Sequence, residues 1–218
     1  MSKTKTWKYT LREIIIVIIG ITIAFSMNKC AESRTDAKLK EQYLSNLKSD
    51  IEADKLQLTK NAKDLKQKLK ICEELIPILN TGKKQGMPLM NSTFELVQYN
   101  TFSPQDITYK TLINSGDLKL IDDFDLKTSI QGHYTQYEQL SDVYFRHTSL
   151  VRDYMGRYMI ENADYDQLFE GNSPFTNEVL LKNIVRALTT TLKDKQVVTK
   201  KAIDNCDNLS VRIKNAMK

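Results

Sequence analysis

The sequence is poor in residues that break or bend a chain. Its 218 residues include only 7 glycines and 4 prolines, together with 3 cysteines, 2 histidines and 1 tryptophan. Architectures made mainly of strands need frequent turn residues, so this scarcity argues against them and favours long uninterrupted helices. No strand-like alternation of useful length occurs either. The expected fold class is therefore all-α.

The sequence also lacks a strong excess of one charge. Lysine and arginine total 32 and aspartate and glutamate total 27, a net charge of +5. This balance is too even to indicate a nucleic-acid-binding protein. In the lysine-rich stretch 48–70, acidic residues alternate with the bases, and no aromatic side chains lie between them to stack on nucleotides. We expect no nucleic-acid partner.

Recurrent motifs of catalysis and cofactor binding are missing. The sequence has no GxGxxG, no glycine-rich phosphate loop, no GxSxG and no HExxH. His133 and His147 are 14 residues apart, about 21 Å along a helix, too far to share a metal ion. The acidic cluster at Asp122, Asp123 and Asp125 is explained by a helix start. We expect neither an enzyme nor a cofactor or metal site.

One long apolar run lies near the N-terminus. Residues 14–27 carry no charge, but as a helix they cover only about 21 Å of a hydrocarbon core about 30 Å thick. Extending the run back to Trp7 gives 21 residues, because Lys8 and Arg12 can reach the headgroups. We therefore predict that residues 7–27 cross a lipid bilayer.

The same run also fits a cleaved signal peptide, with Ala24 and Ser26 forming a candidate cleavage site. A lipoprotein signal ending at Cys30 fits less well, because Lys29 precedes the cysteine where a small residue is needed. Isoleucine-rich cores are less typical of signal peptides than leucine- or alanine-rich ones, and Glu13 directly precedes the run. A retained anchor is the favoured interpretation.

Basic residues on the two sides of the span give the orientation. Four precede it and four follow it: Lys3, Lys5, Lys8 and Arg12, then Lys29, Arg34, Lys38 and Lys40. The leading four are more closely spaced and lie beside the α-amino group. By the positive-inside rule we expect the N-terminus in the cytoplasm, the anchor in a bacterial inner membrane and the rest in the periplasm.

Two small residues lie one helical turn apart within the span. Gly20 and Ala24 form a small-xxx-small pattern, which allows two transmembrane helices to pack closely. The pattern is common by chance, so it indicates a homo-oligomer only weakly.

Beyond the span, apolar residues recur at helical spacing. The pattern predicts a long helix over 31–79, short helices within 93–116, a long helix over 123–160 and a C-terminal helix over 174–216. No linker divides them, so residues 1–29 form a tail and anchor and residues 30–218 form one domain. The transmembrane helix is expected to continue into an elongated bundle of long antiparallel helices.

Several local signals mark the ends of these helices. Ser92 and Glu95 have the spacing of a capping box, Ser103 and Pro104 read as a helix start, and Gly116 reads as the residue after a helix end. Polar residues interrupt the apolar seam of the first long helix at Asp54, Asn61 and Lys68. An interrupted seam favours packing within one chain over a dimeric coiled coil.

The cysteines allow two interpretations. If the second long helix descends and the last one rises again, Cys72 and Cys206 can lie in the same layer of the bundle and form a disulfide in an oxidising compartment. In the other interpretation, slightly favoured, both are buried free thiols on helical seams.

Two segments carry a family resemblance. One is the segment 8–28, in which Glu13 directly precedes an isoleucine-rich run. The other has the spacing Tyr-x-x-Leu-x-x-Ser-Gly-x-Leu and consists of Tyr109, Leu112, Ser115, Gly116 and Leu118. Together they resemble a family of uncharacterised single-pass membrane proteins from Bacteroidota. The chain departs from that family at Arg12, where glycine is usual, and at 28–30, where an Asn/Trp-rich exit is usual. The resemblance implies a retained anchor and supplies no activity.

The second motif has a structural and a functional interpretation. Structurally, Tyr109 and Leu112 share a helical face, Gly116 takes the left-handed conformation and Leu118 folds back as a hydrophobic contact. Functionally, the five residues including Ser115 form a docking knuckle for a partner.

We therefore expect a membrane-anchored, non-enzymatic helical module that binds another envelope protein or self-associates. A sensory domain that binds a small ligand between its helices is the alternative, supported only by the tyrosine-rich helix. A hydrolase with scattered carboxylates is remote.

Overall fold

The computed structural model describes residues 3–81, 86–170 and 172–217 and is all-α, as the sequence predicts. Its elements are α1 (Lys3–Thr81), α2 (Gly86–Val97), α3 (Ile107–Asn114), the 3-10 turn η1 (Asp117–Leu120), α4 (Phe124–Leu150), the π-helical segment η2 (Val151–Gly156), α5 (Arg157–Glu161), α6 (Asp166–Phe169) and α7 (Glu178–Ala216). Outside the helices, the described residues pair only in an isolated antiparallel bridge between Ala163 and Phe175.

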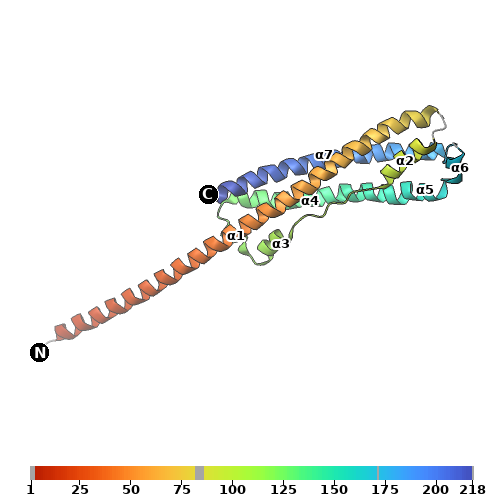
Figure 1. Ribbon diagram of the computed structural model, residues 1–218. Coiled ribbons are helices and arrows are strands. Elements are labelled where there is room, and N and C mark those ends of the chain that lie inside the picture. Colours follow the sequence, from red (N-terminus) through yellow and green to blue (C-terminus); the bar gives the residue numbers. More distant parts are fainter. Residues whose placement is uncertain (1–2, 82–85, 171, 218) are drawn as a thin grey trace.

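α1 is one continuous helix of 79 residues, about 118 Å long. Its first part extends alone away from the bundle, and its later part forms one wall of the bundle (Figure 1). The predicted span and the predicted long helix are therefore a single element. Residues 11–27 are exposed along their whole length, and this helix is long and apolar enough to cross a membrane.

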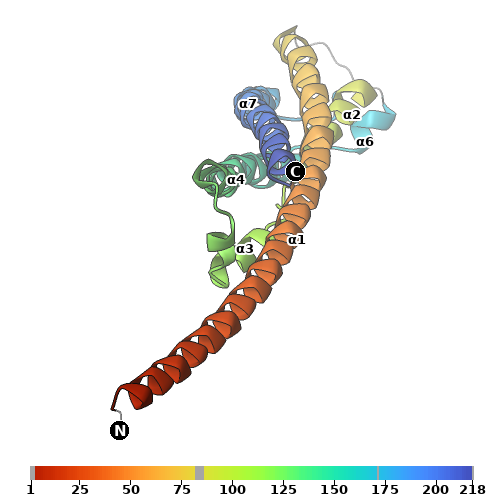
Figure 2. The same cartoon turned by 90° about the vertical axis from the view of Figure 1, so that its left-hand side faces the viewer.

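α4, η2 and α5 follow one another as a second rod, and α7 packs against both this rod and α1. The view in Figure 2 shows α4 and α7 beside the far part of α1, with α2 and α6 on its other side. We call the end of the bundle beyond residue 65 of α1 the distal end and the end nearer the span the proximal end.

The direction of α4 differs from the expected antiparallel order. Lys40 of α1 pairs with Asp122 at the start of α4, and Asn61 donates a hydrogen bond to Tyr144, so both contacts advance together along the two helices. α4 is therefore parallel to α1. α7 is antiparallel to both, since Lys55 pairs with Asp207 near its end. The expectation was wrong because residues 98–123 lead the chain back to the proximal end before α4 begins.

Apolar side chains form two core clusters, one at each end of the bundle. The distal cluster includes Leu65, Cys72 and Leu188, and the proximal cluster includes Leu47, Ile130 and Cys206. The positions predicted from the apolar spacing of α1 are nearly all buried: Leu44, Leu47, Ile51, Leu58, Leu65, Cys72 and Leu79. Between the clusters lie buried polar side chains.

Two helix boundaries that were predicted from local sequence signals are confirmed. Asp123 is the N-cap of α4, and its carboxylate accepts a hydrogen bond from the Leu126 N–H at 3.0 Å. Gly116 follows the end of α3 with φ +75°, the left-handed conformation that glycine adopts most readily.

The predicted start of α2 was too late, and the predicted start of α3 was too early. α2 begins at Gly86, so Ser92 lies inside it and caps nothing; Pro88 is tolerated there because the first turn of a helix needs no N–H donor. α3 begins at Ile107 rather than at Pro104, because residues 98–106 form an irregular segment outside any helix. Residues 82–85, between α1 and α2, lie outside the described residues.

The last helix begins four residues later than the sequence predicts. Its N-cap is Asn177, whose side chain accepts a hydrogen bond from the Leu180 N–H at 3.1 Å. Pro174 does not start a helix, because its carbonyl accepts a hydrogen bond from the Asp164 N–H at 2.7 Å in the short bridge. Phe175 then packs on Tyr158, with 5.6 Å between ring centroids.

Candidate functional site

The buried polar residues of the bundle hold one extended piece of chain. This return segment, Gln98–Asp106, runs back along the bundle between α2 and α3 (Figure 1). Its side chains are mostly exposed, apart from the buried ring of Phe102. An extended segment has no internal hydrogen bonds, so its inward-facing carbonyls need donors from elsewhere.

Buried side chains of α1 and α7 supply donors of this kind. The Lys68 ammonium donates to the carbonyls of Glu95 and Gln98, at 2.9 and 2.6 Å. Lys195 of α7 donates to the Asn100 carbonyl at 2.8 Å. Asn61 donates to the Thr101 carbonyl at 3.1 Å. Each donor is almost fully buried, so its polar group bonds to a carbonyl of the chain in place of water.

Asp54 of α1 also binds the return segment, near the end that leads into α3. Its carboxylate accepts a hydrogen bond from the Gln105 N–H at 2.9 Å, and Tyr134 donates to the Gln105 carbonyl at 3.4 Å. Asp54, Asn61 and Lys68 are the residues that interrupt the apolar seam of α1. The interruptions are therefore the attachment points of the return segment, a role that their spacing in the sequence did not predict.

Burial shifts the pKa values of these groups in the direction that favours the neutral form of each group. It lowers the pKa of Lys195 to about 8 and raises the pKa of Asp54 to about 6. It also lowers the pKa of Lys68, against the opposing field of Asp64. Burial, followed by the fields of Lys195 and Lys68, lowers the pKa of His147 to about 3.

A groove lies at the distal end, where α2 faces η2 and α5. This distal groove has a volume of about 590 Å³. Its apolar lining comes from Phe94, Val97, Tyr99, Val151, Met159 and Ile160. Ile160 is 83% exposed and Phe94 is 45% exposed, so large apolar side chains face solvent here. The volume of the groove falls within the 300–1,000 Å³ typical of small-molecule pockets.

The wall of the distal groove contains a π-helical segment. η2 widens the helix between Val151 and Gly156, and π-helical turns occur frequently at functional sites. Charged side chains at the rim are paired within the chain: Arg152 with Asp153 and Arg157 with Glu161, both at 2.7 Å. The sequence analysis missed this groove. Val151, Met155 and Met159 are four residues apart, a spacing that an ordinary α-helix also produces, so the sequence carries no signal for the π-helical segment.

The two buried cysteines lie in different layers. The Cys72 thiol is hydrogen-bonded with Thr189, whereas the Cys206 sulfur lies 3.4 Å from the Tyr137 hydroxyl. Thr189 and Cys206 are 17 residues apart on α7, about 25 Å. A disulfide needs α-carbons within about 7 Å, so the Cys72–Cys206 pairing was wrong and both are free thiols. Burial raises both thiol pKa values to about 11.

The structure places the residues of the Tyr-x-x-Leu motif mainly inside the chain. The Tyr109 ring stacks on Tyr134 with centroids 4.1 Å apart, and Leu112 is fully buried. Leu118 packs on the proximal core, and the Ser115 hydroxyl accepts a hydrogen bond from the Asp117 N–H at 3.3 Å. Together with the left-handed Gly116, these contacts agree with the structural interpretation. The docking role of the motif stays a prediction.

The transmembrane packing pattern lies on an exposed part of α1. Gly20 and Ala24 are both exposed, and a side chain added at Gly20 would meet no atom within 4 Å. This face of the span is free for contact with lipid or another helix.

A smaller cavity of about 240 Å³ adjoins the tyrosine-rich part of α4. Tyr109, Tyr134 and Tyr137 line it. His133 is buried beside Tyr137, with ring centroids 4.5 Å apart. The cavity is smaller than typical small-molecule sites.

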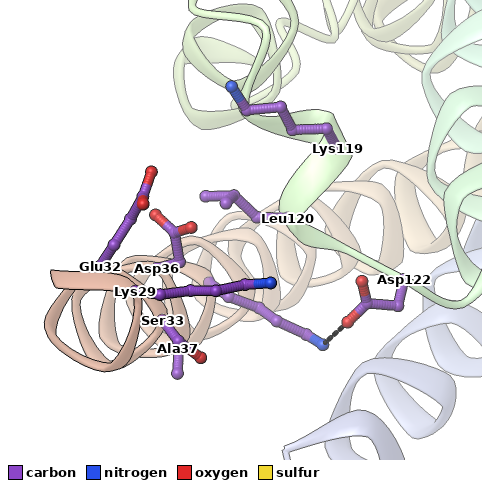
Figure 3. A pocket seen from close by; sticks show the side chains of 9 residues that line it. Lys29, Glu32, Ser33, Asp36, Ala37, Lys119, Leu120 and Asp122 are labelled. Carbon is purple, nitrogen blue, oxygen red and sulfur yellow. Dashed lines mark hydrogen bonds and ion pairs between the residues drawn. The ribbon is translucent and has the colours of Figure 1, made fainter. Parts of the chain in front are cut away.

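A charged pocket lies where α1 leaves the predicted span. This juxtamembrane pocket has a volume of about 440 Å³ and lies between α1 and η1 (Figure 3). Its charged lining residues are Lys29, Glu32, Asp36, Lys40, Lys119 and Asp122. Lys40 and Asp122 form an ion pair at 3.1 Å, and the hydrogen bond from Lys40 holds the pKa of Asp122 below its ordinary value.

Comparison with known proteins places the chain in a family. A model described as "Family of unknown function (DUF6090)" matches residues 13–147. The chain belongs to the DUF6090 family. The matched range takes in all of the uncharged run 14–27, the rest of α1, the return segment and α4 as far as His147, and it stops before η2. The range that matches the DUF6090 model therefore includes Asp54, Asn61 and Lys68 but not the π-helical wall of the distal groove. No curated protein and no solved structure matches the chain.

Proposed function

We propose that this DUF6090 protein is a single-pass membrane protein, without enzymatic activity, whose bundle binds an apolar helix of another protein in the distal groove. The observation that carries the proposal is the groove itself, lined by exposed apolar side chains such as Phe94 and Ile160. An amphipathic helix binds such a groove by laying its apolar face into it.

The position of the groove supports the same function. α1 runs from the apolar segment to the distal end without a break, so an anchored chain holds the groove far from the bilayer. From Met27 to Thr81 is 54 residues, about 81 Å of helix. We further propose that the N-terminus is cytoplasmic and the bundle periplasmic, in a bacterial inner membrane.

Photocrosslinking in cells tests the proposal. A photoreactive amino acid replaces Ile160 in the groove or, as a control, Ile107 of α3, which is 77% exposed and lies outside the groove. We expect adducts with a second protein from position 160 and not from position 107. Phe94→Asp should abolish these adducts by placing a charge on the apolar surface, whereas Phe124→Asp, at an exposed site elsewhere, should leave them unchanged.

The outcomes separate the alternatives. Equal adducts from both positions, or adducts unaffected by Phe94→Asp in a variant with the wild-type melting temperature, would contradict docking at the groove. An adduct of twice the mass of the chain would identify self-assembly there instead.

Ligand sensing is the second candidate function, and the tyrosine-lined cavity favours it. At about 240 Å³ the cavity would accommodate only a very small molecule. Native mass spectrometry of the purified protein tests it. A bound molecule that is lost in Tyr134→Ala would favour sensing over docking.

A further inference from the structure

We propose that the juxtamembrane pocket binds the headgroup of an aminophospholipid such as phosphatidylethanolamine. In this arrangement the phosphodiester lies at Lys29 and the primary ammonium lies at the carboxylate of Glu32, with the Asp36 carboxylate one helical turn farther out. The inference rests on the proposed membrane anchor and adds a lipid to the site where α1 leaves the bilayer.

The first argument is the order of the charges along α1. Counted from Met27, Lys29 lies about 3 Å, Glu32 about 8 Å and Asp36 about 14 Å along the helix. The headgroup layer extends about 5–8 Å beyond the hydrocarbon on each side, so Lys29 and Glu32 lie within it and Asp36 lies beyond it. The pocket thus presents a cation nearest the acyl chains and carboxylates farther out. An aminophospholipid has the complementary order, with its phosphate inside and its ammonium outside.

The second argument is that the pocket keeps charges of both signs without partners. Lys40 and Asp122 neutralise each other, but no ion pair within the described chain involves Lys29, Glu32, Asp36 or Lys119. In Figure 3 the Glu32 and Asp36 carboxylates lie together on the α1 side, Lys119 lies across the gap on η1, and a dashed line joins only Lys40 and Asp122. Two lysines and two carboxylates suit a zwitterion better than a lipid with only negative charge.

The third argument distinguishes ethanolamine from choline. A primary ammonium donates hydrogen bonds to carboxylates, and such charge-assisted bonds are the stronger kind. A quaternary ammonium has no N–H to donate and is recognised mainly by aromatic faces. No aromatic side chain lines this pocket, whose uncharged lining residues are Ser33, Ala37 and Leu120.

Lipid retention by the full-length chain tests the proposal. The protein is reconstituted into vesicles with equal amounts of phosphatidylethanolamine, phosphatidylcholine and phosphatidylglycerol, extracted in mild detergent, and its retained lipids are quantified by mass spectrometry. We expect phosphatidylethanolamine to exceed each other lipid by roughly threefold, the selectivity that one exposed ion pair provides.

Variants test separately which residues bind the ammonium of the headgroup and which bind its phosphate. The double variant Glu32→Gln/Asp36→Asn should retain phosphatidylethanolamine and phosphatidylcholine equally, because the ammonium loses its partners. Lys29→Gln should lower retention of all three lipids. The matched controls Glu41→Gln and Lys38→Gln change exposed residues of the same helix outside the pocket and should keep the wild-type selectivity.

Equal retention of the three lipids by the wild type, or unchanged selectivity in the double variant, would overturn the inference. A soluble phosphate ester could have the same chemistry, so glycerophosphoethanolamine is added to the lipid-bound protein in detergent. Displacement of the lipid by this compound at equal concentration would assign the pocket to a soluble ligand and overturn the lipid proposal. Failure of the chain to float with vesicles would instead remove the anchor and the proposed function, which separates the two failures.

Discussion

Lys195 and His133 represent two ways of burying a titratable side chain. Lys195 is 1% exposed, but its ammonium donates to the Asn100 carbonyl and lies 3.9 Å from the centre of the Tyr144 ring. These partners offset much of the cost of removing the charge from water. His133 is 4% exposed, and neither ring nitrogen has a hydrogen-bond partner. Its burial therefore makes the fold sensitive to acid.

The effect of His133 on the free energy of unfolding is confined to a defined pH range. Burial lowers the pKa of His133 to about 4 in the folded state, from an ordinary value of 6.5. Between these values the unfolded chain binds more protons, so the free energy of unfolding falls as the pH falls from 6.5 to 4, by up to about 3 kcal/mol. Asp54 acts in the opposite direction, since its raised pKa of about 6 gives stability at low pH that is lost as the pH rises through 6.

We predict that His133→Phe removes the histidine contribution while keeping the apolar volume. At pH 7.5 the free energy of unfolding should change by less than about 1 kcal/mol, because no hydrogen bond is lost. At pH 4.5 the variant should be more stable than the wild type by about 2–3 kcal/mol. Urea unfolding of both proteins between pH 4 and 8 measures the difference, in which the Asp54 contribution cancels. Parallel pH profiles would contradict the prediction.

Alanine substitutions at two glycines should change the free energy of unfolding in opposite directions. Gly116 has φ +75°, so Gly116→Ala should lower the free energy of unfolding by about 1–2 kcal/mol through backbone strain alone. Gly132→Ala, inside α4 with no atom within 4 Å of the new side chain, should raise it by about 0.5–1 kcal/mol. Chemical denaturation measures both. The same sign for the two variants would show that the left-handed conformation at Gly116 is not the controlling feature.

At the scale of elements, the return segment explains why α1 carries polar residues on its buried face. The segment has little apolar side-chain area of its own apart from Phe102, so its attachment depends on backbone hydrogen bonds from buried donors. Removing one donor leaves a carbonyl without a partner, which costs more than the hydrogen bond itself contributes.

Lys68→Met tests this dependence. Methionine keeps much of the apolar stem but loses both carbonyl contacts, so we expect a loss of about 2–4 kcal/mol in the free energy of unfolding. Hydrogen exchange should accelerate mainly in α2 and the return segment. The control Lys70→Met removes an ammonium that is 75% exposed and paired with Glu74 on the surface, and should cost less than about 0.5 kcal/mol. Equal effects of the two variants would contradict the attachment.

How far the sequence predicts these elements depends on the range of the interactions that define them. Residues buried by helical periodicity, such as Leu58 and Leu65, and caps set by local geometry, such as Asp123 and Gly116, were predicted because the signal lies within a few residues. The start of α7 was missed because residues 174–176 pair with 162–164, which no local window contains.

The sites were less predictable than the fold. Asp54, Asn61 and Lys68 were identified as interruptions, but their partners are backbone atoms 27–51 residues away. The distal groove depends on α2 meeting η2, and the Cys72–Cys206 hypothesis failed because it depended on a chain order that the return segment changes.

At the scale of the whole molecule, the cysteines report on the proposed orientation. Cys30 is exposed and lies three residues beyond the predicted span, whereas Cys72 and Cys206 are fully buried. We expect a membrane-impermeant maleimide to label only Cys30 in intact cells, and to label the other two only after denaturation. Cys30→Ser serves as the control and should abolish labelling of the native protein. Labelling of Cys30 only after lysis would place the bundle in the cytoplasm and reverse the orientation.

The continuity of α1 has a mechanical consequence. Because the apolar segment and the bundle wall are one helix, a chain anchored as proposed would carry the bundle as a lever whose pivot is the membrane. Transmembrane helices tilt by about 20° on average and adjust that tilt to the bilayer thickness. Over the roughly 81 Å between Met27 and Thr81, a change of about 10° displaces the tip by about 14 Å. A small difference in membrane thickness would therefore move the distal groove by more than the width of a helix.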